Sequence, residues 1–341
     1  MSTAIQLADN TAFIDQYGRQ KRKLRISVTD RCNFKCSYCM PEHPKWAEKH
    51  TLLSFEALYQ FCQFMVQRGI EQIRITGGEP LMRQGIVHFI AQLQQLKPLG
   101  LKRISMTTNG HYLTKYALDL KQAGLDDLNV SLDSLDEAQF QQLTQKHLQP
   151  VLAGIAQAQL VGLKVKVNCV LIKHCNDNQI VPLTHWAIKQ EIELRFIEFM
   201  PLDGDQKWSA TDVVTEQDIL NELATVFKQI DALEQGNNPA RLYRVDHTTI
   251  GIISTISHSF CHQCDRLRLT AQGDFYTCLF AQEGLNIKLL LDHLIGDKDA
   301  TYQDLEQQLT DVIWSKALGF SAIQAQKQQK SGRISMHMMG G

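Results

Sequence analysis

Between residue 23 and about residue 200, short apolar runs alternate with longer amphipathic segments. The short runs are rich in β-branched residues, which favours strands, and the longer segments repeat apolar residues at helical spacing. The predicted strands are Leu24–Val28, Gln72–Thr76, Arg103–Thr107, Asp127–Ser131, Lys164–Val170 and Glu193–Phe199. The predicted helices lie near Ser54–Arg68, Gln84–Leu96, Thr114–Ala123, Asp136–Lys146, Pro150–Val161 and Gln179–Lys189. Alternating strands and helices of this kind predict a parallel sheet covered by helices.

Residues typical of helix ends support several of these helices. The predicted N-caps are Ser54, Thr114 and Asp136, whose side chains can accept a hydrogen bond from the first turn. The predicted helix-end glycines are Gly69, Gly124 and Gly162, at positions where the chain turns out of a helix.

Six strand–helix units are too few for a complete eight-stranded barrel, so an incomplete (β/α)6 barrel of TIM type competes with an open doubly wound sheet. Unusual residues follow the first four strands: a cysteine loop, then Gly77–Pro80, Thr108–Gly110 and Asp133–Ser134. A ring of strands would bring all four segments to one mouth. We therefore predict an α/β fold built on an incomplete (β/α)6 barrel.

The alternating pattern ends near residue 200 and gives way to a polar loop at Pro201–Ser209. The elements predicted beyond it are a helix near Glu216–Phe227 and strands at Arg266–Thr270 and Phe275–Leu279. We therefore expect two domains, a barrel in residues 1–200 and a C-terminal auxiliary unit in residues 201–341.

Composition narrows the choice of partners. The 341 residues carry a net charge of −1, with 44% hydrophobic and 21% charged residues, as in ordinary soluble proteins. Binding of nucleic acid or of a membrane surface needs a strong positive field, which this balance does not supply. No apolar run approaches the roughly 20 residues that span a bilayer, so we expect a cytoplasmic protein that binds neither membrane nor nucleic acid.

Six of the nine cysteines fall in two compact groups, which indicates metal binding in a reducing compartment. In the first group, Cys32, Cys36 and Cys39 place three thiolates within eight residues. Thiolates suit iron–sulfur clusters or zinc. Three ligands on a four-iron cluster leave one iron free for another molecule, whereas a structural zinc would need a fourth ligand, for which His43 is the near candidate.

The second group, Cys261, Cys264 and Cys278, also offers three thiolates. Considered locally, it fits a zinc ribbon completed by His258 or His262 as well as it fits a cluster.

Two arginines follow the second group. Arg266 and Arg268 lie two residues apart in a predicted strand, so they share one face, with Leu267 on the other. Two guanidinium groups beside a metal centre are suited to a phosphate chain. A solvated strand face is the plainer alternative.

The run from Cys32 to Cys39, CNFKCSYC, resembles the signature loop of the radical S-adenosylmethionine superfamily, including the aromatic Tyr38 before the last cysteine. Gly77–Pro80, GGEP, stands at the end of the next strand, as in that superfamily. By itself this second motif would indicate only a tight turn.

Both cysteine groups together, in this order and spacing, resemble the GTP 3′,8-cyclase family of molybdenum-cofactor biosynthesis over nearly the whole chain. The similar segments are LRISVTDRC at 24–32, IRITGGEP at 73–80, NVSLDS at 129–134, KVKVN at 164–168 and LRFIE at 194–198. The connection from Leu202 to Arg241 matches none of the family's motifs.

The resemblance implies two [4Fe-4S] clusters and S-adenosylmethionine as cofactors. The implied cluster ligands are Cys32, Cys36, Cys39, Cys261, Cys264 and Cys278. The implied contacts to S-adenosylmethionine are Tyr38, Gly78, Glu79, Ser131 and Met200. The implied contacts to GTP are Arg25, Arg74, Thr107, Lys166, Arg266, Leu267 and Arg268. The first cluster would cleave S-adenosylmethionine, the resulting radical would take hydrogen from ribose C3′, and C3′ would then join guanine C8.

The same resemblance implies GTP as the substrate, an electron donor, and hand-over of product to the next pterin-forming enzyme, and it leaves a homodimer open. Two other classes compete with it. A radical peptide-modifying enzyme would share the barrel, although we would expect more cysteines in its second half. A zinc-stabilised nucleotide or RNA binder would explain arginines near cysteines, but neither CNFKCSYC nor GGEP.

The C-terminal tail, residues 331–341, admits two interpretations. Chain ends usually fray, and the preceding Gln324–Lys330 is polar, which favours an idle tail. The end MHMMGG is nevertheless apolar, and its final Gly340 and Gly341 allow close approach of the backbone. In the family that the chain resembles, such a glycine pair enters the pocket and aids the radical step, which implies a catalytic role for Gly340 and Gly341.

Overall fold

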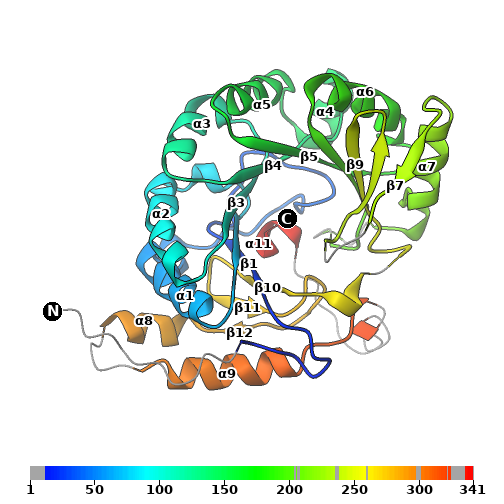
Figure 1. The fold of residues 1–341 in the computed structure, drawn as a ribbon. Coiled ribbons are helices and arrows are strands. Elements are labelled where there is room, and N and C mark those ends of the chain that lie inside the picture. Colours follow the sequence, from blue (N-terminus) through cyan, green and yellow to red (C-terminus); the bar gives the residue numbers. More distant parts are fainter. Residues whose placement is uncertain are drawn as a thin grey trace.

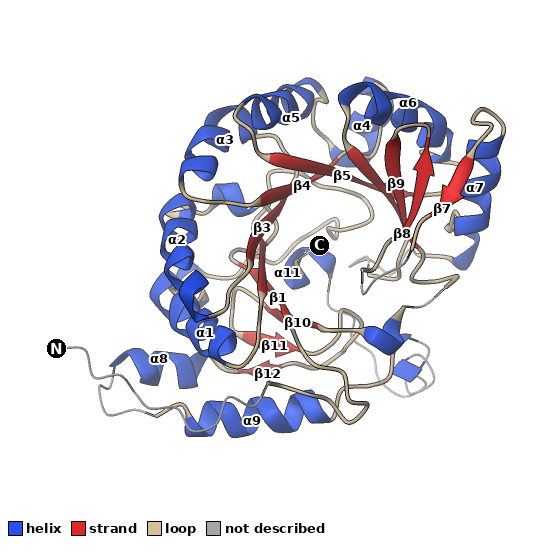
Figure 2. Cartoon of the chain, in the orientation of Figure 1, coloured by secondary structure: helices blue, strands red, loops and turns tan. Residues whose placement is uncertain are grey.

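One curved sheet organises the molecule. The computed structural model describes residues 12–202, 205, 208–234, 238–258, 260–296, 301–320, 322–323 and 335–340. Its strands form a single 12-stranded sheet in the order β12-β11-β10-β1-β2-β3-β4-β5-β6-β9-β8-β7. The sheet curves into an incomplete ring, and the helices lie on its outer side (Figures 1 and 2). The short helix α11 (Met336–Met339) lies inside the curve (Figure 1).

The six predicted strand–helix units are confirmed, with ends shifted by a few residues. The strands are β1 (Lys23–Ser27), β2 (Gln72–Thr76), β3 (Arg103–Thr108), β4 (Asp127–Ser131), β5 (Lys164–Leu171) and β6 (Glu193–Glu198). The helices are α1 (Phe55–Gln67), α2 (Ile86–Leu93), α3 (Leu113–Gln122), α4 (Glu137–Thr144), α5 (Gln149–Leu160) and α6 (Ile180–Gln190). Neighbouring strands from β1 to β6 pair in parallel, as the alternating pattern predicts.

The C-terminal part of the chain extends this sheet at both edges. Its strands are β7 (Ile230–Ala232), β8 (Arg241–Val245), β9 (Thr248–Ile253), β10 (Arg266–Leu269), β11 (Asp274–Tyr276) and β12 (Leu285–Asn286). Strand β9 pairs in parallel with β6, and β10 pairs in parallel with β1. The predicted strand pair is thus present as β10 and β11, although β11 ends earlier than expected, at Tyr276. The predicted helix is α7 (Glu216–Ala224), whereas α8 (Lys288–Gly296) and α9 (Gln303–Trp314) were not anticipated.

The two faces of the sheet differ in polarity. On β1, Leu24 and Ile26 are buried in the main hydrophobic cluster between sheet and helices. Arg25, between them, points to the other side and contacts the backbone of Gly340 beside α11. Alternation along the strands therefore gives an apolar outer face and a polar inner face. Within the described residues, no helix is long and apolar enough to cross a membrane.

Two of the three predicted N-caps are confirmed. The side chains of Ser54 and Asp136 each accept a hydrogen bond from a backbone N–H in the first turn of the helix that follows. The prediction for Thr114 is wrong, because the N-cap of α3 is Tyr112, two residues earlier, and the helix begins at Leu113. The predicted helix-end residues Gly69, Gly124 and Gly162 all adopt positive φ.

This difference between the caps can be tested by unfolding. Ser54→Ala removes the hydrogen bond to the Ala57 N–H, so we expect the free energy of unfolding to fall by about 1 kcal/mol. Thr114→Ala alters an exposed residue inside the first turn, and we expect a change within about 0.5 kcal/mol. Urea denaturation of both variants measures the two values, and equal losses would contradict the assignment of α3.

Candidate active site

The first cysteine loop follows β1 and enters the mouth of the ring. The N–H groups of Cys39 and Met40 both donate to the Cys36 carbonyl at 3.0 Å, which closes the loop into a turn. Burial raises the pKa of all three thiols, and those of Cys36 and Cys39 are raised further by the neighbouring thiols. The three thiols predicted as ligands are therefore near enough to influence one another's charge. Asn109, after β3, directs its amide N–H to the Cys32 sulfur at 3.7 Å.

This loop fits an iron–sulfur cluster better than zinc. Its donor set is three thiols, and His43, the candidate fourth ligand of zinc, is exposed. Across the described ranges, no three His, Cys, Asp or Glu side chains converge closely enough to hold a single metal ion. A cluster distributes its irons over a cube and tolerates a wider spacing of thiolates. Three thiolates around an open position are what such a cluster would require.

The glycine-rich segment after β2 packs directly against the cysteine loop. The Gly78 N–H donates to the Thr29 carbonyl at 2.7 Å. A Cβ atom at Gly78 would overlap the carbonyl oxygen of Arg31. Only glycine allows the two backbones to approach so closely, so the segment is more than the tight turn that it would suggest alone.

Glu79 is a fully buried carboxyl group beside the same loop. It accepts hydrogen bonds from the Thr108 hydroxyl at 2.8 Å, the Asn109 N–H at 2.8 Å and the Leu81 N–H at 3.0 Å. Burial raises the pKa of Glu79 to about 7, although these donors favour its charged form. Glu79 can therefore present a positioned negative charge to a cationic group at the mouth.

Tyr38 points inward to Asp133, a residue that was expected at the mouth but not among the ligand contacts. Its hydroxyl donates to Asp133 at 2.8 Å, and Asp133 also accepts from the Val170 N–H at 2.9 Å. Burial raises the pKa of Asp133 to about 6. The available signal was the position of Asp133 two residues after β4, where a parallel strand ends at the mouth.

The remaining residues predicted to contact S-adenosylmethionine lie on neighbouring elements. Ser131, the last residue of β4, stands in register with Asn168 on β5. The buried amide oxygens of Asn129 and Asn168 have no hydrogen-bond partner among the described residues, as expected of groups that await a ligand. Met200, after β6, packs against a small apolar cluster that includes Phe280.

Three arginines form a row across adjacent strands. Arg268 on β10 stands in register with Arg25 on β1, and Arg25 with Arg74 on β2. Burial lowers the pKa of Arg25, and the positive charges of Arg268 and Arg74 lower it further. Burial likewise lowers the pKa of Arg74 and that of Arg268 to about 10. Buried cations that repel one another form a strong site for an anion.

Lys166 and Arg195 continue the positive charge along the inner face. Glu193 holds the Lys166 ammonium at 2.5 Å and the Arg195 Nε at 2.7 Å. Lys166 was predicted from the sequence, whereas Arg195 was not, because its nearness to Lys166 depends on pairing between β5 and β6. Thr107 lies further round the ring, with its hydroxyl 3.5 Å from Arg74.

The three predicted substrate residues on β10 lie on opposite faces of the strand. Arg266 lies over the ring of Phe260, with its guanidinium carbon 4.7 Å from the ring centre, and shares the inner face with Arg268. Leu267 is fully buried in the outer hydrophobic cluster. Its side chain therefore cannot reach a ligand in the ring, and the prediction for Leu267 is reduced to a contact through its backbone.

In the second cysteine group, Cys261 and Cys264 precede β10, and Cys278 follows β11. Burial raises the pKa of Cys278, and the charges of Cys264 and Cys261 raise it further, so the three thiols are near enough to influence one another. Burial would raise the pKa of Cys264, but the cations of Lys316 and Arg266 bring it down to about 7. A zinc ribbon gains no support, since His262 is exposed and His258 pairs with Glu216 at 3.3 Å.

The last described residues of the tail lie inside the ring. The Ser335 hydroxyl donates to the Cys39 carbonyl at 2.7 Å, and the Met336 N–H donates to the Leu202 carbonyl at 3.1 Å. The Gly340 carbonyl accepts from Arg25 at 3.0 Å and from Arg268 at 2.8 Å. The tail thus meets the first cysteine loop and the arginine row. Gly341 lies outside the described residues.

Two family models match the chain. One is described as the Radical SAM superfamily and matches residues 26–187; the other is described as Molybdenum Cofactor Synthesis C and matches residues 192–322. A GTP 3′,8-cyclase of Staphylococcus epidermidis is 37% identical over 96% of this chain and 98% of its own length. A GTP 3′,8-cyclase of Streptomyces coelicolor is 41% identical over 90% of both chains.

Solved structures resemble the fold. Streptococcus suis SuiB bound to S-adenosylmethionine superposes with a TM-score of 0.64 at 16% identity, over 96% of this chain and 78% of its own. The protein anSMEcpe with bound AdoMet gives a TM-score of 0.55 at 14% identity, over 92% and 93% of the two chains. Identities this low support a shared fold alone.

The buried pair of Tyr38 and Asp133 yields a prediction about stability. Tyr38→Phe removes a hydrogen bond to a buried carboxyl group, and we expect the free energy of unfolding to fall by about 1–3 kcal/mol. As a control, Tyr59→Phe removes a hydroxyl that meets Gln95 at 3.4 Å near the surface, and we expect a change within about 0.5 kcal/mol. Urea denaturation of the iron-free protein compares the variants. If Tyr38→Phe were as harmless as Tyr59→Phe, the two side chains would not be paired.

Proposed function

The chain belongs to the GTP 3′,8-cyclase family, and we propose that the polar inside of its ring is where the reaction of that family takes place. The reaction is the radical cyclisation of GTP to (8S)-3′,8-cyclo-7,8-dihydroguanosine 5′-triphosphate, an early step of molybdenum-cofactor biosynthesis. The enzyme uses S-adenosylmethionine and two [4Fe-4S] clusters. The residue roles given below are our proposal.

In this proposal the first cysteine loop holds one cluster and, beside it, S-adenosylmethionine. When bound there, the cluster supplies the electron that cleaves S-adenosylmethionine to methionine and a 5′-deoxyadenosyl radical. Glu79 attracts the amino group of the methionine part, and Gly78 lets that part approach the backbone. The other contacts to this cofactor are Tyr38, Ser131 and Met200. The buried hydrogen bonds of Glu79 support its role, because they hold the carboxylate in one orientation.

The arginine row is the observation that carries the substrate assignment. Arg268, Arg25 and Arg74 stand side by side on three strands, with Arg266 at the end nearest the second cysteine group. A triphosphate carries the negative charge that such a row requires, and guanidinium groups can bind it with paired hydrogen bonds. Lys166, Arg195 and Thr107 would bind further along the same face. The backbone of Leu267 would complete the set.

At the other end of the substrate, Cys261, Cys264 and Cys278 would hold the second cluster, which would bind the guanine edge. The glycine pair Gly340 and Gly341 would act in the radical step. Support for the tail comes from the Gly340 carbonyl, which already bonds two of the arginines. Residues 1–200 would thus hold the first cluster and S-adenosylmethionine, and residues 201–341 would hold the guanine end and contribute the glycine pair.

The wider setting follows from the same reaction. We propose an external electron donor, hand-over of the cyclised nucleotide to the next pterin-forming enzyme, and work in the cytoplasm, where thiols stay reduced. A homodimer is compatible with this arrangement.

The substrate assignment can be tested with one arginine and a matched control. Arg268→Ala removes a buried guanidinium from the row, so we expect GTP affinity to fall about tenfold or more. Arg22→Ala removes an exposed guanidinium that bonds only Gln20 among the described contacts, and affinity should not change. Anaerobic calorimetry gives the affinities, and 5′-deoxyadenosine formation should respond to GTP but not to ATP. Equal stimulation by ATP would overturn the guanine assignment.

The role of the tail yields a separate prediction. Gly340 has φ of 73°, and an added Cβ would overlap the Thr76 methyl group. Gly340→Ala should displace the tail, because left-handed backbone costs an alanine about 1–2 kcal/mol even without the overlap. We expect cyclised product to fall about tenfold while 5′-deoxyadenosine still forms.

Gly296→Ala is the control, since nothing lies within 4 Å of a Cβ there. Chromatography of both products from the same reaction makes the comparison. An unchanged yield of cyclised product from Gly340→Ala would show that the tail is idle.

A further inference from the structure

The segment before β1 forms a short hairpin with buried charges. Ile14 and Gln20 pair across it, and Asp15, Arg19 and Lys21 are almost completely buried. The Asp15 carboxylate accepts from Arg19 at 2.7 Å and from Lys21 at 2.5 Å. This hairpin precedes the residues matched by either family model, and the proposed reaction gives it no role.

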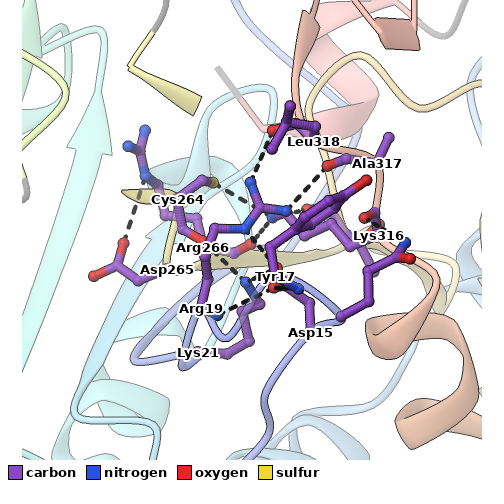
Figure 3. Close-up of polar contacts among 12 residues, drawn as sticks. Asp15, Tyr17, Arg19, Lys21, Cys264, Asp265, Arg266, Lys316, Ala317 and Leu318 are labelled. Atoms are coloured by element: carbon purple, nitrogen blue, oxygen red, sulfur yellow. Dashed lines mark hydrogen bonds and ion pairs between the residues drawn. The ribbon is translucent and has the colours of Figure 1, made fainter. Parts of the chain in front are cut away.

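The two cations of the hairpin reach the second cysteine loop (Figure 3). Arg19 donates to the Cys261 carbonyl at 2.7 Å and to the Leu318 carbonyl at 2.8 Å. Lys21 donates to the Cys264 carbonyl at 3.0 Å. Together they hold the backbone of two of the three proposed ligands.

A third buried cation approaches the loop from the end of α9. Lys316 donates to the Cys264 sulfur at 3.4 Å, to the Arg266 carbonyl at 2.9 Å and to the Thr277 carbonyl. Thr277 directly precedes Cys278, so Lys316 ties the third proposed ligand to the loop that carries the other two. We name Asp15, Arg19, Lys21 and Lys316 the auxiliary clamp.

The charges of the auxiliary clamp do not balance by themselves. Arg19, Lys21 and Lys316 contribute three positive charges and Asp15 one negative charge, which leaves two positive charges buried. Buried charge is costly unless it is paired. The carboxylate of Asp265 pairs with Lys23 instead. The Cys264 sulfur lies 3.4 Å from Lys316 and supplies negative charge once it is deprotonated and bound to metal.

We propose that the auxiliary clamp positions the ligands of the second cluster and makes that cluster easier to reduce. This inference rests on the proposed function, because it assumes a cluster at Cys261, Cys264 and Cys278. Hydrogen bonds to ligand sulfurs and nearby positive charge both raise the reduction potential of an iron–sulfur cluster. Lys316 supplies both at Cys264, while Arg19 and Lys21 act through the backbone. All four are positioning residues, since none touches the substrate in this scheme.

The experiment uses the full chain with Cys32, Cys36 and Cys39 replaced by serine, so that only the second cluster is reconstituted. In this parent, Lys316→Met removes the charge and the hydrogen bond to sulfur. We expect the ratio of oxidised to reduced cluster at a fixed potential to rise about tenfold, or about 59 mV for a one-electron couple. Lys316→Arg keeps the charge and should restore most of the potential. Electron paramagnetic resonance during redox titration measures both.

A second pair of variants tests the hairpin. Arg19→Met should speed the loss of iron to a chelator about tenfold, the effect of one lost charge-assisted hydrogen bond. Arg68→Met is the matched control, because Arg68 is equally buried and pairs with Glu306 away from the cysteines. It should lose iron at the rate of the parent, although it removes a comparable ion pair.

The outcomes separate the inference from the function on which it rests. A parent without iron would overturn the second cluster and the auxiliary clamp together. If the parent binds iron, but Lys316→Met leaves the reduction potential unchanged and Arg19→Met leaves iron retention unchanged, the auxiliary clamp alone is overturned. If Lys316→Met failed to fold, Lys316→Arg and Arg19→Met would still test the auxiliary clamp. Equal iron loss in Arg19→Met and Arg68→Met would show that the hairpin has only a structural role.

Discussion

Positive charge on the inner face of the sheet is the constraint on which the rest of the structure depends. Arg268, Arg25 and Arg74 stand next to one another, where burial removes water and each charge repels the next. Such a row is tolerated only because the outer face is packed against helices and supplies the stability of the fold. The Gly340 carbonyl offers the row a dipole but no charge. A polyanionic ligand would remove the repulsion, so the charges that are unfavourable to bury are the same charges that would bind the ligand.

The order of the strands explains why the two cysteine groups lie beside the same ring. Strand β1 leads into the first cysteine loop, and its neighbour β10 follows directly on Cys264. The C-terminal residues therefore add strands to the sheet itself, at β10 on one side and at β9 on the other. Because β1 and β10 run in parallel, Arg25 and Arg268 face the same space between the two groups. A nucleotide in that space would meet both.

Sequence patterns predicted the elements whose signals are local, and they failed where the signal depends on distant partners. Strands such as Gln72–Thr76 have their own alternation, and the Ser54 cap lies one turn from the N–H that it accepts. Strand β9 was missed because it opens with two threonines and Gly251 interrupts its apolar residues, and because it pairs with the distant β6. The position of Asp133 after a strand placed it at the mouth, but its bond to Tyr38 could not be predicted. Arg195 could be recognised only once Glu193 was placed beside it.

The tail links the two ends of the site. Ser335 bonds the carbonyl of Cys39 in the first cysteine loop, and Gly340 bonds Arg268 on the strand that follows the second group. A triphosphate on the arginine row would use the same guanidinium groups that now hold Gly340, so substrate and tail must adjust to each other there. Such coupling is reciprocal: a substrate that moves the tail is itself bound more or less tightly when the tail is altered. Since the tail also contacts the first loop, it connects the arginine row to the loop that carries Cys32, Cys36 and Cys39.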